Sequence, residues 1–160
     1  MITTGIDIIE IGRIAEIVKT YAHRFLNRIY TQAELKYCKG RYPQLAARFA
    51  AKEAVMKALG TGTRGIGWQD IEVIRTPGNP PEILLHSRAA KRAHSIGITQ
   101  FALSLSHSRE YAVASVIAFN NNSSAIESLN ALEINKSVSR ACIYNKEGGQ
   151  FASYFSGTFK

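Results

Sequence analysis

The sequence predicts an α+β fold in which an antiparallel sheet packs against a long buried helix. Apolar residues occupy most positions between residues 46 and 59, which is typical of a helix that is largely buried. Two runs with strand-like composition, 98–106 and 111–119, flank a short polar turn and predict an antiparallel pair. This order of helices and strands favours an α+β domain over a doubly wound parallel sheet.

A short strand and a helix are predicted at the start of the chain. Ile6 and Ile8 alternate with Asp7, which is the pattern of a strand. In residues 12–30, apolar side chains recur at helical spacing and predict a buried stripe made of Ile14, Ile17, Val18, Tyr21 and Phe25.

A capping box opens the next predicted helix. Thr31 can cap that helix and Glu34 stands three residues later, which is the usual spacing of the two capping residues. The helix should end near Gly40, and Pro43 then separates it from the long buried helix.

The second half of the domain contains four further predicted elements. Residues 70–76 and 82–86 read as strands joined by a turn rich in proline and glycine. Residues 87–95 form a short basic helix that Gly97 ends, and the strands 98–106 and 111–119 follow.

The composition indicates one basic globular domain. The chain has 160 residues, of which 46% are hydrophobic and 20% are charged, so it can bury a normal core. Its net charge of +8 implies an acidic partner, which could be nucleic acid, anionic lipid, a polyphosphate or an acidic protein. No transmembrane run or signal peptide is recognisable, and Cys38 and Cys142 form neither a disulfide framework nor a metal spacing. We therefore expect a cytoplasmic protein that is not embedded in a membrane.

Basic residues concentrate on the first predicted helix. Arg13, Thr20 and Arg24 share one face, and Lys19, His23 and Arg28 lie nearby in the sequence. This face is either the solvated surface of a basic protein or a docking surface for an acidic protein.

The buried helix carries an unusual set of charges. Arg48, Lys52, Glu53 and Lys57 all lie on it, although unpaired buried charge is costly. Glu53 and Lys57 are four residues apart and share a face, so an ordinary helical ion pair of about 0.2–0.5 kcal/mol is one interpretation. The other interpretation is a metal-bound phosphate that satisfies all of these charges together.

Two further polar positions are candidates for the same chemistry. Asp7 lies within an apolar run, where a carboxylate needs a partner unless it merely caps a helix or sits at an edge. His107 lies between Ser106 and Ser108 and close to Arg109, which is a plausible phosphate environment, although a turn histidine is often only solvated.

A glycine-rich loop follows the buried helix and matches the dinucleotide pattern G-x-G-x-x-G literally from Gly60 to Gly65. That pattern binds a dinucleotide only where it follows a strand and opens a helix, so we reject this interpretation. A P-loop is excluded because no Lys-Ser or Lys-Thr follows. The glycines instead end the helix and let backbone amides approach a phosphate.

Three segments together resemble a known family. GIDIIEIGRI, RFAAKEAVMKALGTG and LSLSHSREYAVASV are similar to segments of the holo-[acyl-carrier-protein] synthase family, the small single-domain phosphopantetheinyl transferases, and occur in the family's order and spacing across residues 1–119. The resemblance implies the phosphopantetheinyl transferase-like fold and a role in fatty acid biosynthesis. The implied reaction transfers phosphopantetheine from coenzyme A to a serine of apo acyl carrier protein and releases adenosine bisphosphate.

The resemblance also implies roles for individual residues. Asp7 and Glu53 would bind Mg²⁺, and Glu53 and Lys57 would be catalytic, with Lys57 stabilising charge in the transition state. The serine proton could go to Glu53 or to a metal-bound water. Coenzyme A would be bound by Arg48, Lys57, Gly62, Ser106 and His107. Arg13 and Arg24 would receive the acidic acyl carrier protein, and the enzyme would be a homotrimer.

The predicted transferase domain covers residues 1–119, and residues 120–160 form a C-terminal extension of unknown role. In that extension, a polar linker at 120–124, a helix at 124–135 and weak strands at 141–144 and 151–155 are predicted. Three other functions are considered: a transferase for a dedicated carrier domain of a large synthase, an inactive structural subunit, and a basic nucleic-acid-binding module. The last explains the charge but leaves Asp7 and Glu53 without a role, so no nucleic-acid partner is expected.

Overall fold

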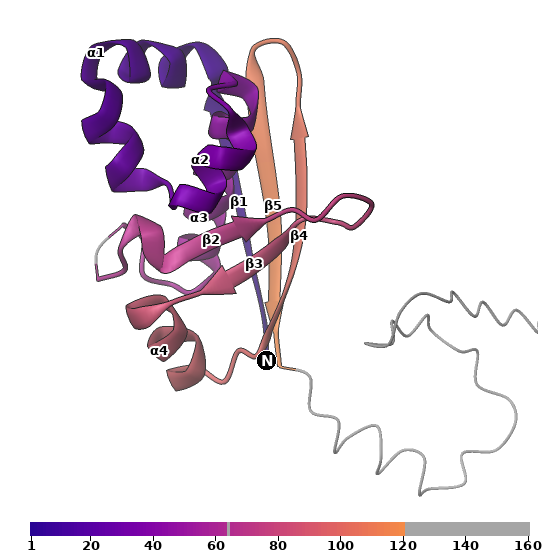
Figure 1. Ribbon diagram of the computed structural model, residues 1–160. Coiled ribbons are helices and arrows are strands. Elements are labelled where there is room, and N and C mark those ends of the chain that lie inside the picture. Colours follow the sequence, from indigo (N-terminus) through magenta and orange to yellow (C-terminus); the bar gives the residue numbers. More distant parts are fainter. Residues whose placement is uncertain (64, 121–160) are drawn as a thin grey trace, which may run out of the picture. The chain divides into compact units, whose positions relative to one another are not determined.

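The computed structural model describes residues 1–63 and 65–120, and it contains two antiparallel sheets (Figure 1). The larger sheet has the strand order β1 (Ile2–Glu10), β5 (Tyr111–Phe119) and β4 (Gln100–His107). The smaller sheet pairs β2 (Ile71–Ile74) with β3 (Glu82–Leu85). The antiparallel pair predicted at the end of the domain is confirmed as β4 and β5.

Four α-helices lie among the described residues: α1 (Ile11–Ile29), α2 (Gln32–Cys38), α3 (Tyr42–Ala58) and α4 (Ser87–Ser95). A short 3₁₀ helix, η1 (Trp68–Asp70), precedes β2 and was not expected from the sequence. Helix α3 packs against β1 and β5 and is largely buried, so the predicted α+β fold with a long buried helix is confirmed.

Small residues allow α3 to lie very close to the larger sheet. The inner face of β5 consists mainly of buried alanines, and α3 presents its own alanines toward the sheet. A Cβ atom added to Gly5 of β1 would lie only 1.9 Å from the carbonyl oxygen of Ala54. This close contact fixes the height of α3 above the strand that carries Asp7.

The predicted capping box is present at the start of α2. The Thr31 hydroxyl accepts a hydrogen bond from the Glu34 amide, and the Glu34 carboxylate accepts one from the Thr31 amide. Helix α3 begins earlier than the motif alone indicated, because Pro43 lies in its first turn, where a missing amide proton is tolerated.

Helix α1 differs from the prediction in its middle. Ala22 has φ 38° and ψ −119°, which breaks the helix and changes which side chains face the core. Ile14 is buried as expected, but Tyr21 is 60% exposed, so its predicted place in the buried stripe is wrong. After the break, Ile29 and Tyr30 enter the core instead.

A fully buried ion pair joins α2, α3 and β2. Lys52 Nζ lies 2.8 Å from Glu34 Oε2, and neither side chain is exposed. Lys52 also donates to the carbonyl oxygens of Trp68 and Ile71, while Glu34 accepts a hydrogen bond from the Val73 amide. Lys52 thus has a structural partner and is not available to a ligand.

The linker, helix and strands predicted within residues 120–160 lie outside the described residues, apart from Asn120 itself. Within the described ranges, no helix has the length and apolar character needed to cross a bilayer.

Candidate active site

Asp7 and Lys57 form the centre of the candidate site. Strand alternation places Gly5, Asp7 and Ile9 on the side of β1 that faces α3, and Asp7 is only 9% exposed. Lys57 Nζ lies 2.8 Å from Asp7 Oδ1 and also donates a hydrogen bond to the Ile6 carbonyl oxygen, at 2.8 Å. The lysine is half exposed, so its ammonium group is held in place and still faces solvent.

Glu53 joins this pair from one turn earlier in α3. Burial raises the pKa of the Glu53 carboxyl above its ordinary value, and the neighbouring Asp7 carboxylate raises it further. The positive charges of Lys57 and Arg13 lower the pKa of Glu53 and so oppose these two effects. The structure therefore brings together Asp7, Glu53, Lys57 and Arg13, and Lys57 pairs with Asp7 of β1 rather than with Glu53 of its own helix.

The two acids are suited to a hard divalent cation. A cation between Asp7 and Glu53 would relieve the repulsion that raises the Glu53 pKa. In residues 1–63 and 65–120, no group of three or more histidine, cysteine, aspartate or glutamate side chains could enclose a metal. Two protein carboxylates are a ligand set that Mg²⁺ commonly uses, with waters and substrate phosphates completing its shell.

Arg48 lies on a different side of α3 and contacts α2. It is 4% exposed, and its guanidinium carbon lies 4.2 Å from the centroid of the Tyr37 ring. Its Nη1 donates to the Gln44 carbonyl oxygen, whereas its Nε has no hydrogen-bond partner in the described part of the chain. A buried guanidinium with an unpartnered nitrogen can accept an anion, although Arg48 has no contact with the Asp7 cluster here.

His107 and Ser106 stand at the end of β4; the sequence had predicted a strand ending at Ser106 with His107 in the following turn. His107 pairs in register with Ala112, and Asp7 pairs with Ala114, so two strand spacings of about 5 Å each separate the histidine from β1. Both side chains are exposed, and the His107 ring contacts only the carbonyl oxygen of Ser108 among the described residues. Within one chain, the structure does not bring His107 into the Asp7 cluster.

The glycine loop follows α3 directly, which confirms that it is not a dinucleotide motif. Gly60 and Gly62 have φ values of 68° and 56°, and hydrogen bonds from the Gly60 and Thr61 amides to Lys57 and Met56 close the helix. A side chain at Gly62 would meet no atom within 4 Å, so the loop offers open space next to the last turn of α3.

The basic residues of α1 are exposed. Arg13, Thr20 and Arg24 all lie on the surface, but the break at Ala22 separates the first two from the third. Arg13 also borders a pocket of about 280 Å³ with Glu10 and Tyr111, two residues that sequence reasoning did not select. Strand alternation could have suggested them, because they pair in register on the outer sheet face.

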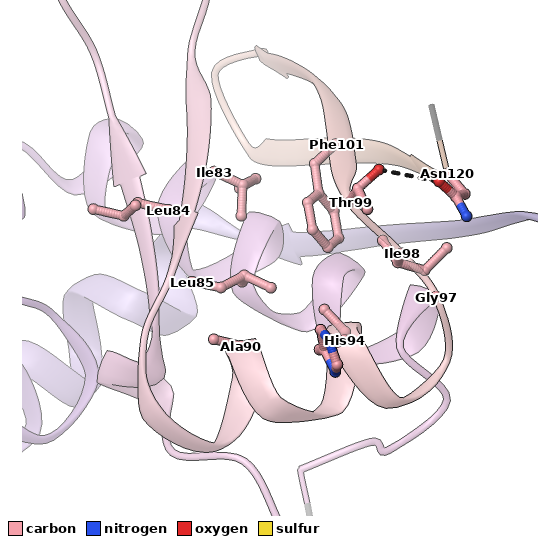
Figure 2. Close-up of a pocket in the computed structure, with 11 residues that line it drawn as sticks. Ile83, Leu84, Leu85, Ala90, His94, Gly97, Ile98, Thr99, Phe101 and Asn120 are labelled. Carbon is pink, nitrogen blue, oxygen red and sulfur yellow. Dashed lines mark hydrogen bonds between the residues drawn. The ribbon is translucent and has the colours of Figure 1, made fainter. Parts of the chain in front are cut away.

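A larger pocket of about 460 Å³ lies elsewhere, between β3, α4 and the start of β4 (Figure 2). Its lining is mainly apolar, with Ile83, Leu85 and Phe101 facing Ala90 and His94 of α4. None of the site residues predicted from the sequence lines it, so cavity size alone would direct attention away from the acidic pair.

Comparison with known proteins gives a consistent result. Residues 3–116 match the model of the 4′-phosphopantetheinyl transferase superfamily. The chain is 52% identical over 118 residues to the holo-[acyl-carrier-protein] synthase of Koribacter versatilis, with 71% of this chain and 94% of the relative covered. It is 50% identical over 118 residues to the protein of the same name from Dehalococcoides mccartyi, with 74% of this chain and 98% of the relative covered.

Solved structures with the same fold include two bacterial enzymes. The crystal structure of Helicobacter pylori holo-[acyl-carrier-protein] synthase in complex with coenzyme A is similar with a TM-score of 0.67 and 33% identity, covering 72% of this chain and 99% of that one. The crystal structure of the Neisseria meningitidis enzyme of the same name is similar with a TM-score of 0.69 and 34% identity, covering 75% of this chain and 100% of that one.

Proposed function

Because the chain belongs to the 4′-phosphopantetheinyl transferase superfamily, we propose that it is a holo-[acyl-carrier-protein] synthase. It transfers the phosphopantetheine group of coenzyme A to a serine of apo acyl carrier protein and releases adenosine bisphosphate. The observation that carries the proposal is the cluster of Asp7, Glu53 and Lys57 beside an open glycine loop. This cluster combines two adjacent carboxylates with a fixed but accessible ammonium group, as phosphoryl chemistry on a metal-bound diphosphate requires.

Asp7 and Glu53 would hold Mg²⁺, and the ion when bound would neutralise charge on the diphosphate of coenzyme A. The fit rests on the adjacency of the two carboxylates, because one divalent cation between them neutralises both charges.

Lys57 stabilises the negative charge that develops on phosphate oxygens during transfer. Its hydrogen bonds to Asp7 and to the Ile6 carbonyl fix the ammonium group before substrate arrives, so little reorganisation is needed. The serine proton would pass to Glu53 or to a water bound to the metal, both of which lie at the acidic pair.

The positions of Arg48 and His107 support an active site shared between subunits. Neither side chain contacts the Asp7 cluster within one chain, yet Arg48 has an unpartnered buried nitrogen and His107 is exposed. Both could bind coenzyme A phosphates presented by a neighbouring subunit, with Ser106 and Gly62 as additional donors.

The outer face of the larger sheet supports a homotrimer. Ile2, Ile6 and Ile8 of β1 are 73%, 64% and 64% exposed, and Tyr111 and Ile117 of β5 extend the same face. A continuous apolar surface of this kind marks an interaction site. A closed threefold ring would cover it with one repeated contact.

This assembly can be tested by substitution. Ile8→Glu should convert the trimer to smaller species in light scattering, because it puts a charge into the contact. Leu84→Glu is the matched control, since Leu84 is 43% exposed but lies on β3, away from this face. A trimer that survives Ile8→Glu, Ile6→Glu and their combination would contradict the proposal.

The acyl carrier protein would dock on α1. Arg13 and Arg24 are exposed cations on this helix. The charge of Arg13 also lowers the pKa of the Glu53 carboxyl, which places Arg13 near the acidic pair. An acidic carrier bound here would therefore present its serine next to the acidic pair.

Mass spectrometry tests the function directly. The full chain is incubated with apo carrier proteins, coenzyme A and Mg²⁺, and the carrier should gain the mass of phosphopantetheine only when both coenzyme A and a divalent ion are present. Free carriers and isolated synthase carrier domains form separate arms, which decides between the two carrier classes. Unmodified carriers in every arm would refute the proposed function.

A further inference from the structure

Arg92 of α4 lies against the end of α3, next to the glycine loop. Its Nε donates a hydrogen bond to the carbonyl oxygen of Leu59, at 3.0 Å. Its Nη2 is 3.6 Å from the position that a Cβ atom would take on Gly60, and no other atom lies within 4 Å of that position. The guanidinium group therefore covers the first residue of the loop.

Most hydrogen-bonding capacity of Arg92 is unused. Among the described residues, its bond to Leu59 is the sole hydrogen bond of the side chain, and it forms no ion pair. Arg88, one turn earlier on the same helix, instead pairs with Asp70 at 3.3 Å. An arginine carries five N–H donors in a planar fork, so Arg92 retains a complete terminal edge for an anion.

The loop beside this edge is shaped for close approach of a ligand. Gly60 and Gly62 both have positive φ values, and a side chain at Gly62 would point into open space. Lys57, in the last turn of α3, lies on the side of β1, while Arg92 approaches from α4. Two cations from different elements thus flank the end of α3 and the open loop.

We propose that Arg92 binds an oxygen of the coenzyme A diphosphate at the loop formed by Gly60, Thr61 and Gly62. This inference rests on the proposed function, because it takes coenzyme A as the ligand. Arg92 is a substrate-binding residue on α4, a helix to which the sequence assigned no functional role. Its terminal N–H groups form charge-assisted, potentially bidentate hydrogen bonds to phosphate oxygens.

A purely structural role for Arg92 makes different predictions. Arginine often caps a helix by donating to its last carbonyl groups, and Nε already does so here. A capping role needs only a donor near Leu59, whereas phosphate binding needs the positive charge. Arg92→Gln keeps a side-chain donor without the charge, and Arg92→Lys keeps the charge without the fork.

Calorimetric binding of coenzyme A separates these roles. We expect Arg92→Ala and Arg92→Gln each to weaken binding by about 10-fold to 100-fold, and Arg92→Lys to recover part of the loss. Lys91→Ala is the matched control, because Lys91 is an exposed cation on the same helix, and it should bind as the wild type does. Wild-type binding by Arg92→Gln would overturn the inference, even if Arg92→Ala were impaired.

Dephospho-coenzyme A, which lacks the 3′-phosphate, identifies the phosphate concerned. An equal loss of affinity for both ligands on substitution of Arg92 supports the diphosphate contact, and a loss confined to coenzyme A overturns it. Transfer by the wild type is measured separately. Normal transfer with unaffected binding in the variants refutes only this inference, whereas absent transfer in the wild type refutes the proposed function.

Discussion

Gly5→Ala is the substitution whose effect follows most directly from the packing of α3 on the sheet. The added Cβ atom would lie 1.9 Å from the Ala54 oxygen, 2.8 Å from the Ala54 carbonyl carbon and 3.0 Å from the Ala58 amide nitrogen. Ordinary contacts between heavy atoms are about 3.5 Å, so α3 must move away from β1 by roughly 1.5 Å. All of these atoms belong to the backbone, so no side-chain rotation can relieve the contact.

The expected cost is large for the addition of one methyl group. Overpacking in a core typically destabilises by about 1–3 kcal/mol, and the rigid backbone contact puts Gly5→Ala at the upper end. For a domain of this size, about 3 kcal/mol corresponds to a fall in Tm on the order of 10 °C. The displacement also separates Lys57 from Asp7, so transfer activity should fall in the folded variant.

Gly12→Ala is the matched control. Gly12 lies in α1, and a Cβ atom there would meet nothing within 4 Å. Alanine is the better helix former, so this variant should be more stable by about 0.5–1 kcal/mol. Urea denaturation followed by circular dichroism, at one protein concentration, measures both variants. A loss below about 1 kcal/mol for Gly5→Ala, with normal activity, would refute the close contact between β1 and α3.

Four further substitutions test the roles of charged residues. Glu53→Gln should abolish Mg²⁺-dependent transfer, and Lys57→Ala should reduce turnover by on the order of 10²-fold, both measured by carrier mass spectrometry. Arg13→Glu should weaken carrier binding in surface plasmon resonance, and wild-type binding should fall as salt rises, because exposed charges are screened. Glu34→Gln should lower the free energy of unfolding by about 3–5 kcal/mol, because it leaves Lys52 charged, buried and without its carboxylate partner.

For three of these substitutions, a specific result would contradict the reasoning. Near-normal activity of Glu53→Gln would remove Glu53 from the metal site. Equal losses of carrier and coenzyme A affinity in Arg13→Glu would show that α1 is not a dedicated docking surface. A small effect of Glu34→Gln would mean that the carbonyl oxygens of Trp68 and Ile71 suffice to hold the Lys52 ammonium group.

The sequence predicted most of the elements because the decisive signals are local. The capping box at Thr31 and the paired strands at the end of the domain are found as expected. The break in α1 could not be predicted, since alanine at position 22 carries no signal for a positive φ. Tyr21, next to the break, was therefore wrongly placed in the buried stripe, whereas Phe25 beyond the break still packs against the core.

The candidate site was predictable in part. Asp7, Glu53 and Lys57 meet because strand alternation and helical spacing fix their directions once β1 packs on α3. The alternation of residues in β1 could not show which side of the strand faces the core. The inner side is the one that continues the buried alanines of β5, because these small residues leave room for α3. Arg92 was missed because its position depends on how α4 packs against the end of α3, which no local pattern encodes.

The alternation in β1 has a consequence for how the domain assembles. A shift of one residue against β5 would turn Asp7 outward and place Thr4 or Ile6 in the narrow space under α3, where Gly5 now lies. Strand β1 leaves the ribosome before the other strands, yet its partner β5 ends at Phe119, so β1 cannot pair until nearly all of the domain has been synthesised. The close packing at Gly5 therefore disfavours a misaligned pairing of β1 late in folding, and the same packing keeps Asp7 on the side of α3.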